Sequence, residues 1–491
     1  MAEESVDYFS FMPDELVKFI KRDTYSLLIK GLAGTGKTTL SLTILRALER
    51  QSKFFYISTR TSPKQLFQYY PWLDSFVNTT SLPAEDSAEH STAVPASFED
   101  ARLDEPESLF ERITNQLMDI KSPVIIIDSW DAIASFMDKE ARLNNERVLQ
   151  TWRERAGAKL VFISEHPSDT TLDFLVDGIV ELKQVHHDGA RLRELTLLKM
   201  RGVRINRPSY FYTLEGTMFR CISPFVPLAF LPKEAEKTRQ KPKAVSPQLN
   251  GPTKASHPSA NIPTSYPGLD EAIGTGFPLA GVVLVELRQH VTTRAALEFL
   301  GRPISGYLQR GNPVLVDPFD SMDPVLAYRF LSQFIPAEPD KRKTKNALRV
   351  FAAAGRPEAK DPPDYIMTGS KSKGSEYIDA VEKLSRAFGD RPLFAIAGGQ
   401  SLLEEIGMGA AGATLPRQLT SRIRSNKHLL LAVVRTSDSR ALDHFSEISD
   451  IHLRLNMVNG TLILQTIVPS SSVFAMVFTP PQNDLVLQQI V

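Results

Sequence analysis

One glycine-rich segment contains the residue types that bind a chain of phosphates. Residues 31–38 read GLAGTGKT, which fits the pattern G-x-x-x-x-G-K-[ST], between an apolar run at 26–30 and a segment of helical periodicity. Glycines let the backbone fold around phosphates and aim its N–H groups at them, and the start of the following helix favours an anion. In such a loop the lysine reaches the β- and γ-phosphates and the Ser or Thr hydroxyl ligates Mg2+. The expected nucleotide-binding residues are Gly31, Ala33, Gly34, Thr35, Gly36, Lys37, Thr38 and Thr39, the last on the α-phosphate.

A carboxylate is expected across this site, because the magnesium of a bound triphosphate needs a second protein ligand. The run VIIID at 124–128 ends in Asp128. Any buried strand can end in an aspartate, but beside an intact P-loop this pattern indicates a metal ligand. The sequence therefore predicts that ATP binds with Mg2+ on Thr38 and Asp128, and it makes Lys37 and Asp128 candidate catalytic residues.

The composition is that of an ordinary globular protein, and its 491 residues are too many for one hydrophobic core. Lys and Arg number 57, as do Asp and Glu, so the overall positive field of a typical nucleic-acid binder is missing. The single cysteine, Cys221, cannot form an internal disulfide. The sequence has no signal-peptide pattern and no apolar run long enough to span a bilayer, so we expect a cytoplasmic protein.

Six apolar runs recur in the same order in the two halves of the chain. The pairs are 26–30 with 282–286, 54–58 with 313–317, 124–128 with 393–397, 160–164 with 429–434, 177–185 with 450–458, and 195–200 with 461–466. The first four runs of each half are separated by helical patterns, which indicates parallel strands covered on both faces. The last two leave no room for a crossover helix, which indicates a hairpin. The sequence predicts an α/β protein of two RecA-like three-layer (αβα) domains in tandem.

A segment rich in Pro, Ser and Lys separates the two halves. Residues 233–263 have almost nothing to bury and are expected to form a flexible linker between domains at 1–232 and 264–491. The linker lysines suit either a solvated tether or a contact with nucleic acid. Residues 79–107 and 356–374 also lack apolar periodicity and are expected to be long loops inside the domains.

The second half lacks the residues of a nucleotide site. After its first strand the segment LRQHVTTRAAL has no glycine and no P-loop lysine, and the strand that matches VIIID ends at residues 397–399 in Ala-Gly-Gly. The positions that would form the loop include Arg288, His290 and Arg294. We expect a pseudo-ATPase domain, used for contacts or for binding something else.

Four segments of the first half resemble a known family. They are LLIKGLAGTGKTTL, IIIDSWDAI, FLVDGIVELKQV, and LTLLKMRG followed by FYTLEG. With them the chain resembles the RecA-like ATPases of the KaiC type, common in archaea, and among these the GvpD-like P-loop proteins. In KaiC-like proteins the Lys-x-Arg-Gly strand reaches the ATP of a neighbouring subunit, so the resemblance implies a role in trans for Lys199 and Arg201. The alternative is an edge strand with exposed basic side chains.

The chain departs from this family at the position of the catalytic base. KaiC-type proteins have a pair of glutamates after the second strand, where this sequence has Arg60 and Thr61. A general base contributes about a hundred- to ten-thousandfold to a rate, so hydrolysis is expected to be slow. Glu165, which follows a neighbouring strand, is the nearest candidate base, because the ends of adjacent strands converge at such sites. The alternative for Glu165 is a solvated loop acid.

These features favour an ATP-dependent regulatory switch that hydrolyses slowly and resets. The GvpD-like resemblance implies regulation of gene expression through a protein partner, and self-association is also expected. One alternative is a RecA-class accessory ATPase of DNA recombination or repair, which neutral charge disfavours. Another is a KaiC-like autokinase, which the loops rich in Ser and Thr permit.

Overall fold

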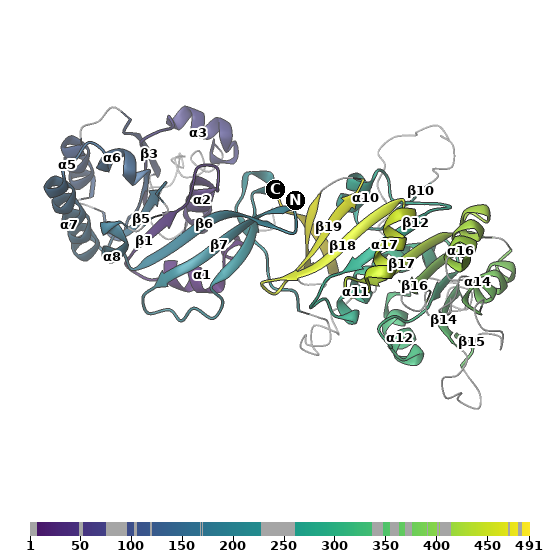
Figure 1. Ribbon diagram of the computed structural model, residues 1–491. Coiled ribbons are helices and arrows are strands. Elements are labelled where there is room, and N and C mark those ends of the chain that lie inside the picture. The colour runs from purple at the N-terminus through teal and green to yellow at the C-terminus, as the bar shows by residue number, and fades with distance from the viewer. Residues whose placement is uncertain are drawn as a thin grey trace, which may run out of the picture. The chain divides into compact units, whose positions relative to one another are not determined.

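The structure, a computed structural model, describes residues 7–48, 53–74, 96–102, 106–117, 120–166, 168, 170–226, 261–335, 347–353, 363–368, 376–389, 391–399, 402, 414–469, 472–479 and 484–491. The chain forms two compact units (Figure 1): Met1–Ser223 with Ile490–Val491, and Pro224–Gln489. Residues 233–260 of the expected linker lie outside the described residues. No helix in the described ranges is both long and apolar enough to cross a membrane.

The first unit is built on one nine-stranded sheet in the order β3-β2-β4-β5-β1-β6-β7-β8-β9. Pairing is parallel from β3 to β6 and antiparallel from β6 to β9. The strands are β1 (Tyr25–Lys30), β2 (Phe54–Ser58), β3 (Ala96–Asp100), β4 (Val124–Asp128), β5 (Lys159–Ser164), β6 (Gly178–His187), β7 (Ala190–Met200), β8 (Ser209–Thr213) and β9 (Arg220–Cys221).

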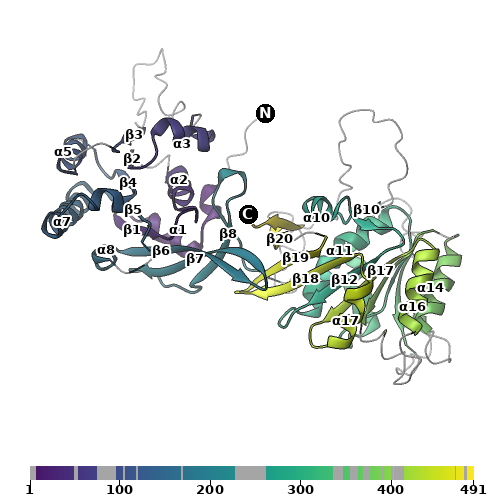
Figure 2. The same ribbon diagram turned by 45° about the horizontal axis from the view of Figure 1, so that its top comes forward.

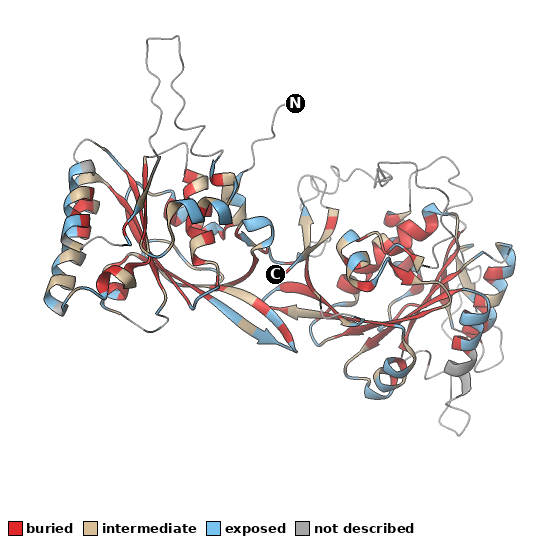
Figure 3. Cartoon of the chain, turned by 90° about the horizontal axis from the view of Figure 1, so that it is seen from above, coloured by how far each residue is buried: buried red, intermediate tan, exposed pale blue. Residues whose placement is uncertain are grey.

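Helices cover both faces of the first sheet, because the central strands are apolar on both sides. Alternate residues of β1 point into two separate cores: Leu27 packs with α1, α2 and α3, and Leu28 with α5, α6, α7 and α8. Figure 3 shows these strands as a buried layer between exposed helix surfaces. The helices are α1 (Asp14–Ile20), α2 (Lys37–Leu48), α3 (Pro63–Tyr69), α5 (Pro106–Leu117), α6 (Trp130–Ala134), α7 (Lys139–Ala156) and α8 (Thr171–Leu175).

The second unit contains a ten-stranded sheet in the order β15-β14-β13-β16-β17-β12-β18-β19-β20-β21, and a small sheet of β10 and β11. Its strands are β10 (Asn261–Ile262), β11 (Phe277–Pro278), β12 (Val282–Leu287), β13 (Val314–Val316), β14 (Leu348–Ala352), β15 (Ile366–Thr368), β16 (Phe394–Gly398), β17 (Leu429–Arg435), β18 (Ile451–Val458), β19 (Thr461–Val468), β20 (Val473–Thr479) and β21 (Asp484–Gln489).

Two helical layers again enclose the sheet. The core of one face contains residues of α10, α11 and α12, and the core of the other contains residues of α14, α16 and α17. Figure 2 shows α14 and α16 together on one side of this sheet. The helices are α10 (Pro267–Ile273), α11 (Thr293–Gln309), α12 (Pro324–Leu331), α14 (Glu376–Ala387), α16 (Thr414–Ser425) and α17 (Ser439–Ile448).

The two sheets share one topology, which confirms the predicted fold class of two RecA-like α/β domains. The six repeated runs of the sequence form β1, β2, β4, β5, β6 and β7 in the first unit and β12, β13, β16, β17, β18 and β19 in the second, in the same spatial order. One side-chain contact that occurs in both units aligns the two sheets residue by residue. Asp177 Oδ2 accepts a hydrogen bond from the Ser26 amide at 3.1 Å, and Asp450 Oδ2 accepts one from the Val282 amide at 2.8 Å. Ser26 and Val282 therefore occupy equivalent positions.

Both segments expected to be long loops contain a strand, so those two predictions were wrong in part. β3 lies within residues 79–107 and pairs in parallel with β2, and β15 lies within residues 356–374 and pairs with β14. Each is the edge strand of its sheet. An edge strand has a partner on one side alone and need not be a continuous apolar run, which is why composition gave no signal there. Other parts of both segments lie outside the described residues.

Candidate nucleotide-binding site

The glycine-rich loop lies at the carboxyl end of β1, a fully buried strand with parallel neighbours on both sides. At Gly31 φ is +154° and an added Cβ would lie 2.3 Å from the carbonyl oxygen of Leu182. At Gly36 φ is +89° and a Cβ would lie 2.8 Å from Leu214 Cδ2. Neither position has room for a side chain, which explains the two glycines of the motif. The loop residues between them include Leu32, Ala33 and Gly34, which are exposed.

Lys37 begins α2 and turns its amine back onto the loop. Its Nζ donates a hydrogen bond of 2.9 Å to the carbonyl of Leu32, which also accepts the Thr35 hydroxyl at 2.8 Å. Lys37 is only 7% exposed, and burial lowers the pKa of its amine, although the nearby Glu165 and Asp128 carboxylates oppose that change. An anion in the loop would stabilise this buried cation more effectively than a neutral carbonyl does.

Thr38 and Asp128 come together as the motif predicts. The Thr38 hydroxyl donates to Asp128 Oδ2 at 2.7 Å, and the Tyr56 hydroxyl from β2 donates to the same oxygen at 2.6 Å. Burial raises the pKa of Asp128, while these two hydrogen bonds and Lys37 act in the opposite direction. A desolvated carboxylate of this kind is stabilised by a bound cation.

The residues present fit a magnesium ion that is shared with a nucleotide. Mg2+ is usually held by one or two protein oxygens together with phosphates and waters, and Thr38 and Asp128 supply such a pair. Within the described part of the chain, no group of three or more His, Cys, Asp or Glu is placed to hold a metal by itself. The donor set therefore suits a metal that arrives with phosphate ligands.

Glu165 lies at the carboxyl end of β5, as its place in the strand order suggested. Its Oε2 is 2.5 Å from Arg60 Nη1, and its backbone amide donates to Asp131 Oδ2 at 2.5 Å. Asp131 also accepts the Ser164 hydroxyl at 3.1 Å, so it fixes the backbone at the end of this strand. Arg60, at a position of the family glutamate pair, thus occupies one oxygen of the candidate base.

Thr39 has a partner inside the protein. Its hydroxyl lies 2.8 Å from the Tyr70 hydroxyl, and its side chain is 7% exposed. A contact with an α-phosphate would need this hydroxyl to share or exchange its partner.

Several residues that shape the site were missed by sequence reasoning. Tyr212 on β8 donates to the Thr35 carbonyl at 2.5 Å, and Arg193 on β7 donates to the Gly34 carbonyl at 2.9 Å. The other missed residues are Tyr56, Tyr70 and Asp131. Asp131 could have been found, because it follows Asp128 by three positions in the segment IIIDSWDAI. Tyr212 lies in the segment FYTLEG, which carries part of the family resemblance but does not reveal the contact with the loop. Tyr56, Tyr70 and Arg193 belong to no pattern, since only the fold brings them to the loop.

Lys199 and Arg201 lie away from the loop of their own unit. Lys199 pairs with Ile179 and the Arg201 amide donates to the Asp177 carbonyl, at the end of the sheet where β6 begins. The P-loop follows the opposite end of β1, after Lys30. These two basic residues are therefore not candidates for contact with the phosphates of the same domain.

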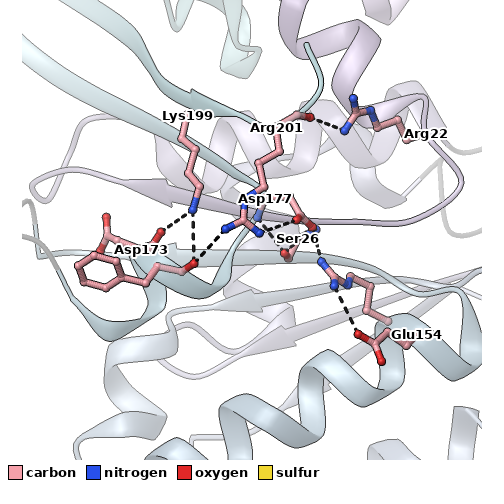
Figure 4. Close-up of polar contacts among 9 residues, drawn as sticks. Arg22, Ser26, Glu154, Asp173, Asp177, Lys199 and Arg201 are labelled. Carbon is pink, nitrogen blue, oxygen red and sulfur yellow. Dashed lines mark hydrogen bonds and ion pairs between the residues drawn. The ribbon is translucent and has the colours of Figure 1, made fainter.

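Both side chains are held by α8 and by Asp177, which lies between α8 and β6 (Figure 4). Lys199 Nζ donates to the Asp173 carbonyl at 2.9 Å, and Arg201 Nη1 lies 3.4 Å from Asp177 Oδ1. Arg201 remains 56% exposed. The backbone carbonyl of Arg201 in turn accepts a hydrogen bond of 2.5 Å from Arg22. Arg201 is thus oriented at the surface and accessible to a partner.

In the second unit a side chain from a neighbouring strand contacts the segment that replaces the P-loop. Arg435 Nη1 donates to the Val291 carbonyl at 3.0 Å, in the short segment that replaces the P-loop. By sheet register, the position of Asp128 corresponds to Gly398, since these residues pair with the equivalent Ile163 and Val433.

The first unit is a P-loop domain: a glycine-rich loop between a central parallel strand and a helix, with an aspartate on the hydroxyl of the loop. Residues 16–198 match the family profile "GvpD gas vesicle protein, P-loop domain". Over this span the first unit is similar to the P-loop domain of GvpD gas vesicle proteins. It is 26% identical over 342 residues to "Protein GvpD2" of Halobacterium salinarum, which covers 67% of this chain and 66% of the relative. It is 32% identical over 238 residues to "Protein GvpD1" of the same organism, which covers 46% and 43%. The chain thus spans less than two thirds of either relative.

Proposed function

We propose that this protein binds ATP with Mg2+ at residues 31–39 and Asp128 and acts in the cytoplasm as a nucleotide-dependent regulatory switch. The observation that carries the proposal is the hydrogen bond of 2.7 Å between Thr38 and Asp128, beside the buried amine of Lys37. A hydroxyl, a carboxylate and a buried cation around a glycine-rich loop are the groups that a magnesium-bound triphosphate requires. The regulatory part rests on what the resemblance to GvpD-like proteins implies.

Hydrolysis by this site is proposed to be slow. KaiC-type proteins have a pair of glutamates where this chain has Arg60 and Thr61, so the usual general base is missing. A site without that base forfeits much of the roughly hundred- to ten-thousandfold contribution of general-base catalysis. A long-lived bound triphosphate suits a switch, because its occupancy persists long enough for a partner to respond.

Assembly is proposed to complete the site, by analogy with KaiC-type proteins. Lys199 and Arg201 lie at the other end of the sheet from the loop, and Arg201 is 56% exposed. In an assembly, a guanidinium of one subunit can stabilise charge on the phosphates of another. The second unit, with Gly398 in place of the metal carboxylate, is proposed to serve as a pseudo-ATPase domain.

ATP turnover per chain, measured over a hundredfold range of protein concentration, tests this function. We expect low turnover that rises with concentration and that is absent in Lys37→Ala. Lys183→Ala is the matched control, because Lys183 is 49% exposed and lies on β6, outside the loop. Fast turnover at every concentration would contradict both the slow switch and its completion by a neighbour. Loss of turnover in the Lys183 control would contradict the assignment to the P-loop.

A further inference from the structure

Arg60 is a second cation at the candidate phosphate site. It follows β2, and its Nη1 reaches Oε2 of Glu165, which follows β5, at 2.5 Å. β4, which ends in Asp128, lies between those two strands in the sheet. The Lys37 amine lies within electrostatic range of Arg60, Glu165 and Asp128 together. Arg60, Asp128 and Glu165 therefore lie at the carboxyl edge of the sheet, the edge at which the P-loop follows β1.

The second unit contains an ion pair at the position of Glu165 with its charges reversed. Ser164 pairs with Lys30, and Val434 pairs with Glu286, which is the equivalent position of β12. The next residues along the chain are Glu165 and Arg435. These two residues are therefore structural equivalents, one acidic and one basic.

The same counting relates Arg60 to Asp320. Ser58 pairs with Asp128, and Val316 pairs with Ile396, two positions before the Gly398 that corresponds to Asp128. Position 318 therefore corresponds to Ser58, and Asp320 corresponds to Arg60. Arg435 Nε lies 2.6 Å from Asp320 Oδ1, so both units join these two strand ends by an ion pair.

The two ion pairs differ in how firmly they are held. In the second unit the Thr293 hydroxyl donates to Asp320 Oδ2 at 2.6 Å and Arg435 also binds the Val291 carbonyl, so several contacts fix the pair. Arg60 is 52% exposed, and in the described part of the chain its one hydrogen-bonded partner is Glu165. An exposed ion pair contributes little to stability, so exchange of its carboxylate for another anion costs little.

We propose that Arg60 binds the terminal phosphate of a bound nucleoside triphosphate, exchanging Glu165 for that phosphate, and so lets the site distinguish a triphosphate from a diphosphate. This inference rests on the proposed nucleotide site. A planar guanidinium binds phosphate oxygens in pairs, and the terminal phosphate bears more charge than the single carboxylate that it replaces. The exchange also frees the Glu165 carboxylate only when a triphosphate is present. Arg60, at a position that carries a glutamate in KaiC-type proteins, would here distinguish a bound triphosphate from a bound diphosphate.

The test compares the affinities of the full-length protein for ADP and for the non-hydrolysable triphosphate AMP-PNP, both with Mg2+, by isothermal titration calorimetry. For Arg60→Ala we expect AMP-PNP affinity to fall about tenfold or more, as loss of one charge-assisted hydrogen bond implies, with ADP affinity within about threefold of wild type. Arg60→Lys should restore part of the difference. Glu165→Gln, which releases Arg60 from its partner, should raise the affinity for AMP-PNP relative to that for ADP.

Arg102→Ala is the matched control, because Arg102 is also exposed and paired with an acid, Asp100. It should leave both affinities unchanged. An Arg60→Ala protein that binds both ligands with the wild-type ratio would overturn the role of Arg60 and leave the nucleotide site standing. A wild-type protein that binds neither ligand would overturn the nucleotide site itself, and with it this inference.

Discussion

The substitution Asp128→Asn separates the stability of the first unit from its capacity to bind a nucleotide. Burial raises the pKa of Asp128, so the folded state binds its proton more tightly than the unfolded chain. The stabilisation that this gives is complete below the unfolded pKa and is lost as the pH rises through the folded pKa. Above that range the ionised carboxylate destabilises the fold. The cost is about 1.4 kcal/mol for every tenfold decrease in the acid dissociation constant of Asp128 on folding. Asparagine carries no such cost, and its amide oxygen can still accept from Thr38 and Tyr56.

Without nucleotide, the asparagine variant should therefore be at least as stable as the wild type at pH 8, with an advantage that decreases as the pH falls through the folded pKa of Asp128. Saturating ATP and Mg2+ should reverse that order, because a ligand at a hundred times its Kd adds about 2.7 kcal/mol to a protein that binds it. Thermal unfolding of both proteins at pH 8 and at lower pH values, with and without the ligand, measures these stabilities. Equal stabilisation of both proteins by the ligand would refute the assignment of Asp128 to the metal.

Three further predictions concern other charged groups. Asp173→Asn should destabilise the first unit by about 3–5 kcal/mol in thermal unfolding, because it removes the carboxylate that lies 2.7 Å from the buried amine of Lys30; a change below about 1 kcal/mol would contradict this. In the second unit, burial opposes ionisation of Glu286, but hydrogen bonds from His452 and Arg454 outweigh it and lower the pKa of Glu286 from its usual 4.5. The stabilisation that results is present above pH 4.5 and is lost as the pH falls through the folded pKa. Acid unfolding of Glu286→Gln should lack that component, and an unchanged pH profile would count against it. Arg201→Ala should abolish the rise of ATP turnover with protein concentration while leaving nucleotide affinity unchanged, and a persistent rise would exclude the role in trans.

Much of the fold could be predicted from the sequence because the central strands of a parallel sheet are buried on both faces. That burial forces continuous apolar runs such as 124–128 and 393–397, and a duplicated domain repeats them in order. The edge strands β3 and β15 were not predicted. Each pairs with a neighbouring strand on one side alone, so it need not be a continuous apolar run.

The candidate site could be predicted only where a sequence motif marks the groups. Lys37 and Thr38 are adjacent in one motif, and Asp128 ends an apolar strand whose place beside β2 follows from topology. The pairing of Arg60 with Glu165 could not be predicted, because no sequence motif relates them and side-chain direction decides the contact. The same holds for Tyr212, which reaches the loop from β8.

Equilibrium binding of ATP with Mg2+ to the purified protein is the strongest test of the proposed nucleotide site. We expect one nucleotide per chain in the wild type, none in Lys37→Ala, and a marked loss of affinity when Mg2+ is removed. The Lys183→Ala control should bind as the wild type does. Two nucleotides per chain would contradict the assignment of the second unit as a pseudo-ATPase domain, and binding that survives Lys37→Ala would contradict the site itself.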